Sequence, residues 1–183
     1  MTTNNPVNTG LSGTTGSGNF VGANTPTLIT PVLGAATATS INFGGSTLSN
    51  YVTNTSFTPG MTIGGSSTGI TFSVQNGIYA RIGSIVHFSV DITMTSRGGL
   101  TGAVVITGLP LTASSAVSTN YVASINTGNV TYSSGQIIAA FVTSNTSVIN
   151  LYIQATGTTV STLQASTNVG DTSIFYINGS YLV

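Results

Sequence analysis

The chain has almost no charge. Its 183 residues include two arginines, two aspartates and one histidine, with no lysine or glutamate, so that 2% of the residues are charged. An ordinary domain is about one quarter charged. A net charge near zero also removes the electrostatic attraction on which binding to nucleic acid and to anionic lipid depends. We therefore expect neither as a partner, and solubility must rest on Thr, Ser, Asn and Gly.

Other absences exclude further classes. Without cysteine the chain has no disulfide framework and no thiolate chemistry. The longest wholly apolar run is the six residues 137–142, against about twenty for a membrane-spanning helix. The residues after Met1 are polar and show no secretory signal pattern. Because clustered metal ligands are lacking, we expect no cofactor and no metal, unless three copies of His87 meet on a three-fold axis.

The first 50 residues differ in composition from the rest. They contain clusters of Gly, Ser and Thr, prolines at positions 6, 26 and 31, and only short apolar groups. No helical or strand period extends through them. The pattern predicts an extended N-terminal stem or linker over residues 1–50, which is either flexible or ordered against other copies of itself. Residues 51–183 are then one β domain.

Alternating apolar residues and turn signals predict strands in residues 51–183. Asn76-Gly77 and Gly83-Ser84 are typical of two-residue hairpin turns, which predicts a three-stranded meander over 70–74, 78–82 and 85–94. Further strands are expected at 103–106, 121–125, 130–132, 137–142, 148–153 and 173–177. Many short strands without an amphipathic helix predict an all-β, antiparallel β-sandwich or jelly roll. One face of the meander carries Ile70, Phe72, Val74, Tyr79, Val86, Phe88, Val90, Ile92 and Met94.

Four of the five ionisable residues of types Asp, Arg and His lie between positions 78 and 97; they are Arg81, His87, Asp91 and Arg97. The face opposite the predicted core begins apolar, with Ile78, Ala80, Ile82 and Ile85, and continues with His87, Ser89 and Asp91. A half-apolar second face favours coverage by a subunit neighbour. We therefore expect the four charged residues to have structural or interface roles.

The sequence favours a protein that is not an enzyme. His87 and Asp91 lie four residues apart on one strand, about 13 Å, and cannot touch. Gly65-Ser66-Ser67-Thr68-Gly69 matches a nucleophile elbow, but the elbow needs a following helix and a strand follows here. A glycosidase needs two carboxylates about 5 to 10 Å apart. Asp91 and Asp171 are the only carboxylates, and no pattern brings them together.

Turns near exposed aromatic residues are the candidates for ligand binding. Loops at the ends of a β-sandwich carry function while the sheets supply rigidity. The turns predicted at 127–129 and 144–146, with flanking tyrosines, point to Tyr121, Asn129, Tyr132 and Asn145. Their hydroxyl, amide and aromatic groups suit a neutral sugar. The alternative is that these turns are merely solvated.

Two stretches resemble tail fibres of tailed bacteriophages. Residues 16–52 are similar to their connecting segments, and residues 56–96, followed by "GAVVITGLP", are similar to their C-terminal receptor-binding domain. The residues that carry the second likeness are Gly77, Tyr79, Ile82, Gly83, Val86 and Gly108-Leu109-Pro110. All are structural, so no functional residue transfers.

The resemblance implies an intertwined homotrimer in the virion, joined to other tail proteins, whose β-sandwich tip binds host cell-surface polysaccharide. It also implies assembly in the host cytoplasm and release by lysis. Two alternatives remain: a purely structural virion component, such as a capsid decoration or fibre connector, and a tailspike-type hydrolase, which the scarcity of carboxylates disfavours.

We predict a homotrimer, because the second face of the meander is half apolar and the N-terminal segment cannot build a core alone. Multi-angle light scattering of the full chain at micromolar concentration should give three times the chain mass of 18.4 kDa. A monomer under these conditions would contradict the prediction.

Overall fold

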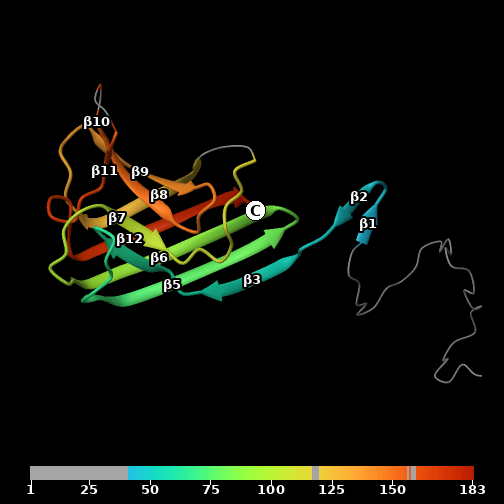
Figure 1. Ribbon diagram of the computed structural model, residues 1–183, viewed down its shortest axis with the longest axis horizontal. Helices are drawn as coiled ribbons and strands as arrows, with labels where there is room; N and C mark the ends of the chain where they lie inside the picture. The colour runs from blue at the N-terminus through green and yellow to red at the C-terminus, as the bar shows by residue number, and fades with distance from the viewer. Residues whose placement is uncertain (1–40, 117–119, 156, 158–159) are drawn as a thin grey trace, which may run out of the picture. The chain divides into compact units, whose positions relative to one another are not determined.

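The computed structural model describes residues 41–116, 120–155, 157 and 160–183 (Figure 1). Every regular element in these ranges is a β-strand, so they include no helix that could cross a membrane. All strand pairs are antiparallel, which confirms the all-β antiparallel class. The predictions for residues 1–40 lie outside the described residues. Within the predicted stem, β1 (Ile41–Phe43) and β2 (Ser46–Leu48) form a separate short hairpin.

The other ten strands described form one continuous sheet, in the order β3-β5-β6-β12-β8-β9-β10-β7-β4, with β11 paired to β10. The long strands β5, β6 and β12 lie side by side, and the sheet curls so that the strands from β8 to β4 make a second arm (Figure 1). Their bounds are β3 Val52–Phe57, β4 Gly60–Ile63, β5 Ile70–Ile82, β6 Ile85–Arg97, β7 Val104–Thr107, β8 Asn120–Val130, β9 Gln136–Thr143, β10 Ile149–Ala155, β11 Ser161–Thr162 and β12 Val169–Leu182.

The two ends of the sheet are joined by the chain itself. β3 and β4 stand at opposite ends of the strand order, yet only Thr58 and Pro59 separate them in sequence. The Gln75 side-chain amide on β5 donates to the carbonyl oxygen of Pro59 at 2.9 Å. This short connection holds the curl, because it brings the two edge strands together.

The core lies inside the curl. Every second residue of β6 is buried, from Val86 to Met94, as the alternation predicts. β12 adds Phe175, Ile177 and Tyr181. The Tyr181 hydroxyl donates to the carbonyl oxygen of Leu111 at 2.9 Å, and burial raises the pKa of Tyr181 to about 12. The hydroxyl is therefore neutral at physiological pH and keeps its role as a donor.

One of the two predicted hairpin turns is confirmed and the other is wrong. Ile82 pairs with Ile85 around Gly83-Ser84, and Gly83 has a φ of 59°. At Asn76-Gly77, however, β5 runs straight through, with Asn76 opposite Asp91 and Gly77 opposite Val90. Gly77 serves close packing instead, since a Cβ there would lie 2.6 to 2.7 Å from ring atoms of Phe57.

Two further local predictions are wrong. The pairing of β5 with β6 shifts between Phe72 and Val74, which puts Val74 opposite Thr93 and off the predicted core face. Thr127-Gly128-Asn129 is not a turn, because these residues lie within β8 and pair through Gly128 with Ile174. At 127–129, as at Asn76-Gly77, the long neighbouring strand supplies hydrogen bonds that outweigh the local turn preference.

We predict that Gly77→Ala destabilises the protein by about 1 to 3 kcal/mol, because the new methyl group would overlap the Phe57 ring. Chemical denaturation of the purified protein measures this change in the free energy of unfolding.

Gly170→Ala is the matched control, since a Cβ there meets nothing within 4 Å. Its stability should stay the same or rise slightly. Phe57→Leu should recover part of the loss when combined with Gly77→Ala, and equal losses in both glycine variants would contradict the packing argument.

Candidate ligand-binding site

The long strands carry a line of polar side chains on the face turned away from the core. The strand register places Asn76 of β5 opposite Asp91 of β6, Asp91 opposite Tyr176 of β12, and Tyr176 opposite Asn126 of β8. We call these four residues the polar row. Since neighbouring strands lie about 4.8 Å apart, the row spans about 14 Å across the sheet.

One carboxylate oxygen of Asp91 is buried without a hydrogen-bond donor among the described residues. Its Oδ1 is buried and accepts no hydrogen bond within the described part of the chain. Such an oxygen is costly, because burial removes water without supplying another donor. The other members of the row are accessible: Asn76 and Asn126 are exposed, and Tyr176 is 47% exposed. The row thus presents two amides and an aromatic ring around a carboxylate that lacks a donor.

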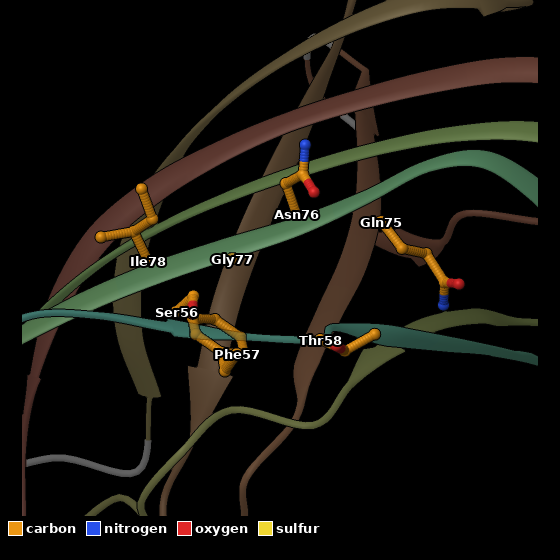
Figure 2. A pocket seen from close by; sticks show the side chains of 7 residues that line it. All are labelled: Ser56, Phe57, Thr58, Gln75, Asn76, Gly77 and Ile78. Carbon is orange, nitrogen blue, oxygen red and sulfur yellow. The ribbon is translucent and has the colours of Figure 1, made fainter.

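A first pocket adjoins the β5 end of the polar row. Its volume is about 370 Å³, and it is lined by Ser56, Phe57, Thr58, Gln75, Asn76, Gly77 and Ile78. Figure 2 shows Asn76 and Ile78 on one side of β5 and the side chains of Phe57 and Gln75 on the other. The pocket lies where β3 leaves β5, next to the two residues that lead into β4. It combines hydroxyl and amide groups with an exposed isoleucine.

A second pocket adjoins the β8 end of the row. Residues Asn120–Ala123 of β8 pair with residues Ala140–Thr143 of β9. Beyond Ala123 the two strands diverge. The opening has a volume of about 330 Å³ and is lined by Ile125, Asn126, Thr127, Tyr132, Gln136, Ile137 and Ile138. The Gln136 side-chain oxygen accepts from the Ser133 N–H at 2.7 Å, which holds the β8–β9 turn in place. Tyr132 is 48% exposed at this opening.

The same outer face has an apolar end. Ile82, Ile85 and Val122 are exposed there, Val122 to 72%; we call these three residues the apolar patch. His87 is exposed on β6 between Ile85 of the patch and Asp91 of the row, opposite Ala80 and Ser180. The outer face is therefore divided along the strands into an apolar and a polar part, as the sequence pattern predicts.

The four residues predicted to bind ligand do not form one site. Tyr121 and Asn145 lie near one end of β8, and Asn129 and Tyr132 near the other, about 27 Å away by strand rise. The Tyr121 hydroxyl donates to the Ser114 carbonyl at 2.7 Å, and the Asn129 side chain donates to the Thr172 carbonyl at 3.0 Å. Asn145 is exposed in the turn after β9. Tyr132 alone lines one of the two pockets described above.

Of the four clustered charged residues, Arg81 and Arg97 donate hydrogen bonds to backbone carbonyls, and His87 is exposed. Arg81 Nε donates to the Gly83 carbonyl at 2.7 Å, within the β5–β6 turn. Arg97 Nη1 donates to the carbonyls of Leu100 at 3.0 Å and Ala165 at 3.2 Å. His87 is exposed on the outer face. Both guanidinium groups thus hold loops, and the interface role expected of all four residues stays a prediction.

Within the described residues of one chain, the two aspartates do not form a carboxylate pair. The Arg97 N–H donates to Asp171 Oδ1 at 2.8 Å, and Asp91 lies six residues before Arg97 on the same strand, so the two carboxylates are about 20 Å apart. That distance is about twice what a glycosidase pair allows. The Gly65–Gly69 segment leads into β5 and not into a helix. No group of three potential metal ligands occurs among the described residues.

The sequence points to Tyr132 as a ligand contact and to Asp91 only as a structural or interface residue, and it does not single out Asn76, Tyr176 and Asn126. The Asn76-Gly77 pair predicts a turn at Asn76. Tyr176 alternates with buried Phe175 and Ile177, a signal that places it on an outer face but does not reveal its neighbours on other strands.

No protein-family model matches the chain, and no curated protein does. Among solved structures, the crystal structure of the Dettilon tailspike protein (gp208) is similar, with a TM-score of 0.56 and 25% sequence identity. The match covers 70% of this chain and 23% of the tailspike chain. The likeness supports a phage tail protein and agrees with the resemblance seen in the sequence.

We predict that Arg97→Ala lowers the free energy of unfolding by about 1 to 3 kcal/mol, because two loop carbonyls lose their charged donor. Thermal and chemical denaturation measure the loss. Asp171→Ala should also destabilise, whereas Asp171→Asn, which keeps the acceptor for the Arg97 N–H, should change stability less. Wild-type stability in Arg97→Ala would show that these hydrogen bonds contribute nothing.

Proposed function

We propose that this chain belongs to the host-attachment apparatus of a bacteriophage tail and binds glycan on the host cell surface. The observation that carries the proposal is the structural likeness to the Dettilon tailspike protein, together with the tail-fibre resemblance of residues 56–110. Because the match spans 23% of the tailspike chain, the role of the whole tailspike does not transfer as such. The proposal rests on the surface of this chain as well.

The surface chemistry supports a neutral glycan. Both arginines donate to backbone carbonyls, and the chain has no lysine. Strong binding of a polyanion depends on several such cations. The accessible groups are instead amides, hydroxyls and tyrosine rings, which form hydrogen bonds and apolar contacts with sugars at any ionic strength.

The proposal includes binding without hydrolysis. The two carboxylates are about 20 Å apart within one chain, and one of them accepts a backbone N–H from Arg97. Turnover of a host polysaccharide by the purified protein would overturn this part of the proposal.

We further propose that the working unit is a homotrimer in the virion, attached to other tail proteins. The apolar patch supports association, because exposed apolar residues gathered on one face mark contact surfaces. Three sites on one particle raise the effective affinity by multivalency, about 10²- to 10⁴-fold when all engage the same surface.

The alternative is a purely structural virion component without a ligand, such as a fibre connector. The apolar patch is equally compatible with permanent burial against another tail protein. Adsorption of the isolated protein to host cells separates the two functions, since a connector has no reason to bind cells.

We predict that the full-length protein adsorbs to host cells and that its adsorption changes little between about 50 and 200 mM salt. A polyanion binder that makes 6–10 phosphate-type contacts would lose about 10³- to 10⁵-fold over this range. Fluorescently labelled protein and flow cytometry measure the adsorption. A steep loss with salt would indicate an acidic ligand, and absence of adsorption at both concentrations would favour the connector.

A further inference from the structure

We propose that the polar row and its two flanking pockets form one groove, and that this groove binds a neutral oligosaccharide lying across the strands. The inference rests on the proposed attachment function and names the site and the class of ligand. Asn76 lines the first pocket and Asn126 lines the second, so the row connects them directly. A ligand that fills both pockets must extend beyond the row's length of about 14 Å, which requires a chain of several sugar units.

The hydrogen-bonding groups of the row match sugar hydroxyls. An ionised carboxylate only accepts hydrogen bonds, whereas an asparagine amide both donates and accepts. Sugar hydroxyls supply the donors that Asp91 lacks, and a hydrogen bond to a carboxylate is stronger than one between neutral groups. Asp91 as a whole is partly exposed, so its carboxylate lies within reach of a ligand on the outer face.

The charges of the groove select a neutral ligand. Asp91 repels an acidic sugar, and no cation of the described residues is placed to offset it: Arg81 and Arg97 bind backbone carbonyls elsewhere, and His87 lies four residues from Asp91 on β6, about 13 Å away. A sialic or uronic acid in the row would therefore lose its hydration without gaining an ion pair.

Two tyrosine rings provide apolar contact at one end of the groove. Tyr176 stands opposite Asn126 in the sheet, and Tyr132 lines the same pocket as Asn126. Both rings are about half exposed. Sugar rings have an apolar side formed by C–H groups, and an aromatic ring that stands on a rigid strand contacts it with little loss of conformational freedom.

The groove and the apolar patch occupy different parts of the outer face. Along β6, Ile85 of the patch and Asp91 of the row are six residues or about 20 Å apart, and along β8, Val122 and Asn126 are four residues or about 13 Å apart. A neighbouring copy can cover the patch while the groove stays open. The four residues of the polar row stand on paired strands and not on loops, so these groups are held in place before the ligand arrives.

The test uses the full-length protein in its native oligomer and an array of neutral mono- to hexasaccharides with sialylated and uronic-acid oligosaccharides beside them. We expect binding to neutral oligosaccharides that strengthens with length. Tyr176→Ala should weaken the apparent affinity for the best neutral oligosaccharide by about tenfold, and Asn76→Ala and Asn126→Ala by about three- to tenfold each. Asp91→Asn, which keeps the shape of the side chain but removes its charge, should also weaken binding.

Matched controls are Tyr51→Ala and Asn54→Ala, because both residues are exposed and lie outside the row. These two variants should bind as the wild type does. Light scattering and thermal melting check that each variant keeps its oligomeric state and fold. If Tyr176→Ala does not fold, the two asparagine variants carry the test alone.

The outcomes separate the groove from the attachment function. Wild-type binding to glycan with unchanged affinity in all row variants would overturn the groove and leave the attachment function standing. No binding to any glycan and no adsorption to cells would overturn both. Preference for acidic oligosaccharides would overturn the neutral ligand, and a change of oligomeric state in the row variants would show that the row is covered by another copy.

Discussion

The sheet depends on the placement of β12 between β6 and β8. β12 is the strand that joins the arm made of β3, β5 and β6 to the arm that runs from β8 to β4. It also supplies large buried side chains, including Phe175, Ile177 and Tyr181. Without this double pairing, the two arms would have no shared hydrogen-bond ladder and the core between them would not close. The polar row exists for the same reason, because Tyr176 bridges Asp91 on one side and Asn126 on the other.

The two faces of the long strands have different roles, one in the core and one at the surface. Residues that point inward close the core, and the residues between them point outward and build the groove. A substitution such as Tyr176→Ala therefore removes a ligand contact without opening a cavity in the core. This arrangement places the polar row on paired strands, whereas the sequence pointed to loops. Tyr132 is both a loop residue, as the sequence predicts, and part of the candidate site, since it follows β8 and lines the pocket beside Asn126.

The few charged residues fix loops at strand ends, and their scarcity limits the class of the proposed ligand. Each arginine donates to backbone carbonyls, and Asp171 accepts the Arg97 N–H, so these charges fix the loops at strand ends. Asp91 differs from them because its buried oxygen has no donor within the described residues. A nearly uncharged surface cannot attract an ion at a distance. It can bind hydroxyl-rich molecules through many short-range contacts, which is the behaviour that attachment to a dense neutral glycan requires.

The sequence alone determined the all-β class, the alternation along 85–94, the Gly83-Ser84 turn and the division of the outer face into apolar and polar parts. These properties depend on the order of residues within one strand or one turn. Tertiary structure decided whether Asn76-Gly77 turns or continues, because the long β6 strand offered it partners and the Phe57 ring needed a residue without a Cβ. It also decided the site. Asn76, Asp91, Asn126 and Tyr176 come from four strands spread over 101 positions of the chain, and only the pairing of β12 with both β6 and β8 sets them in one row.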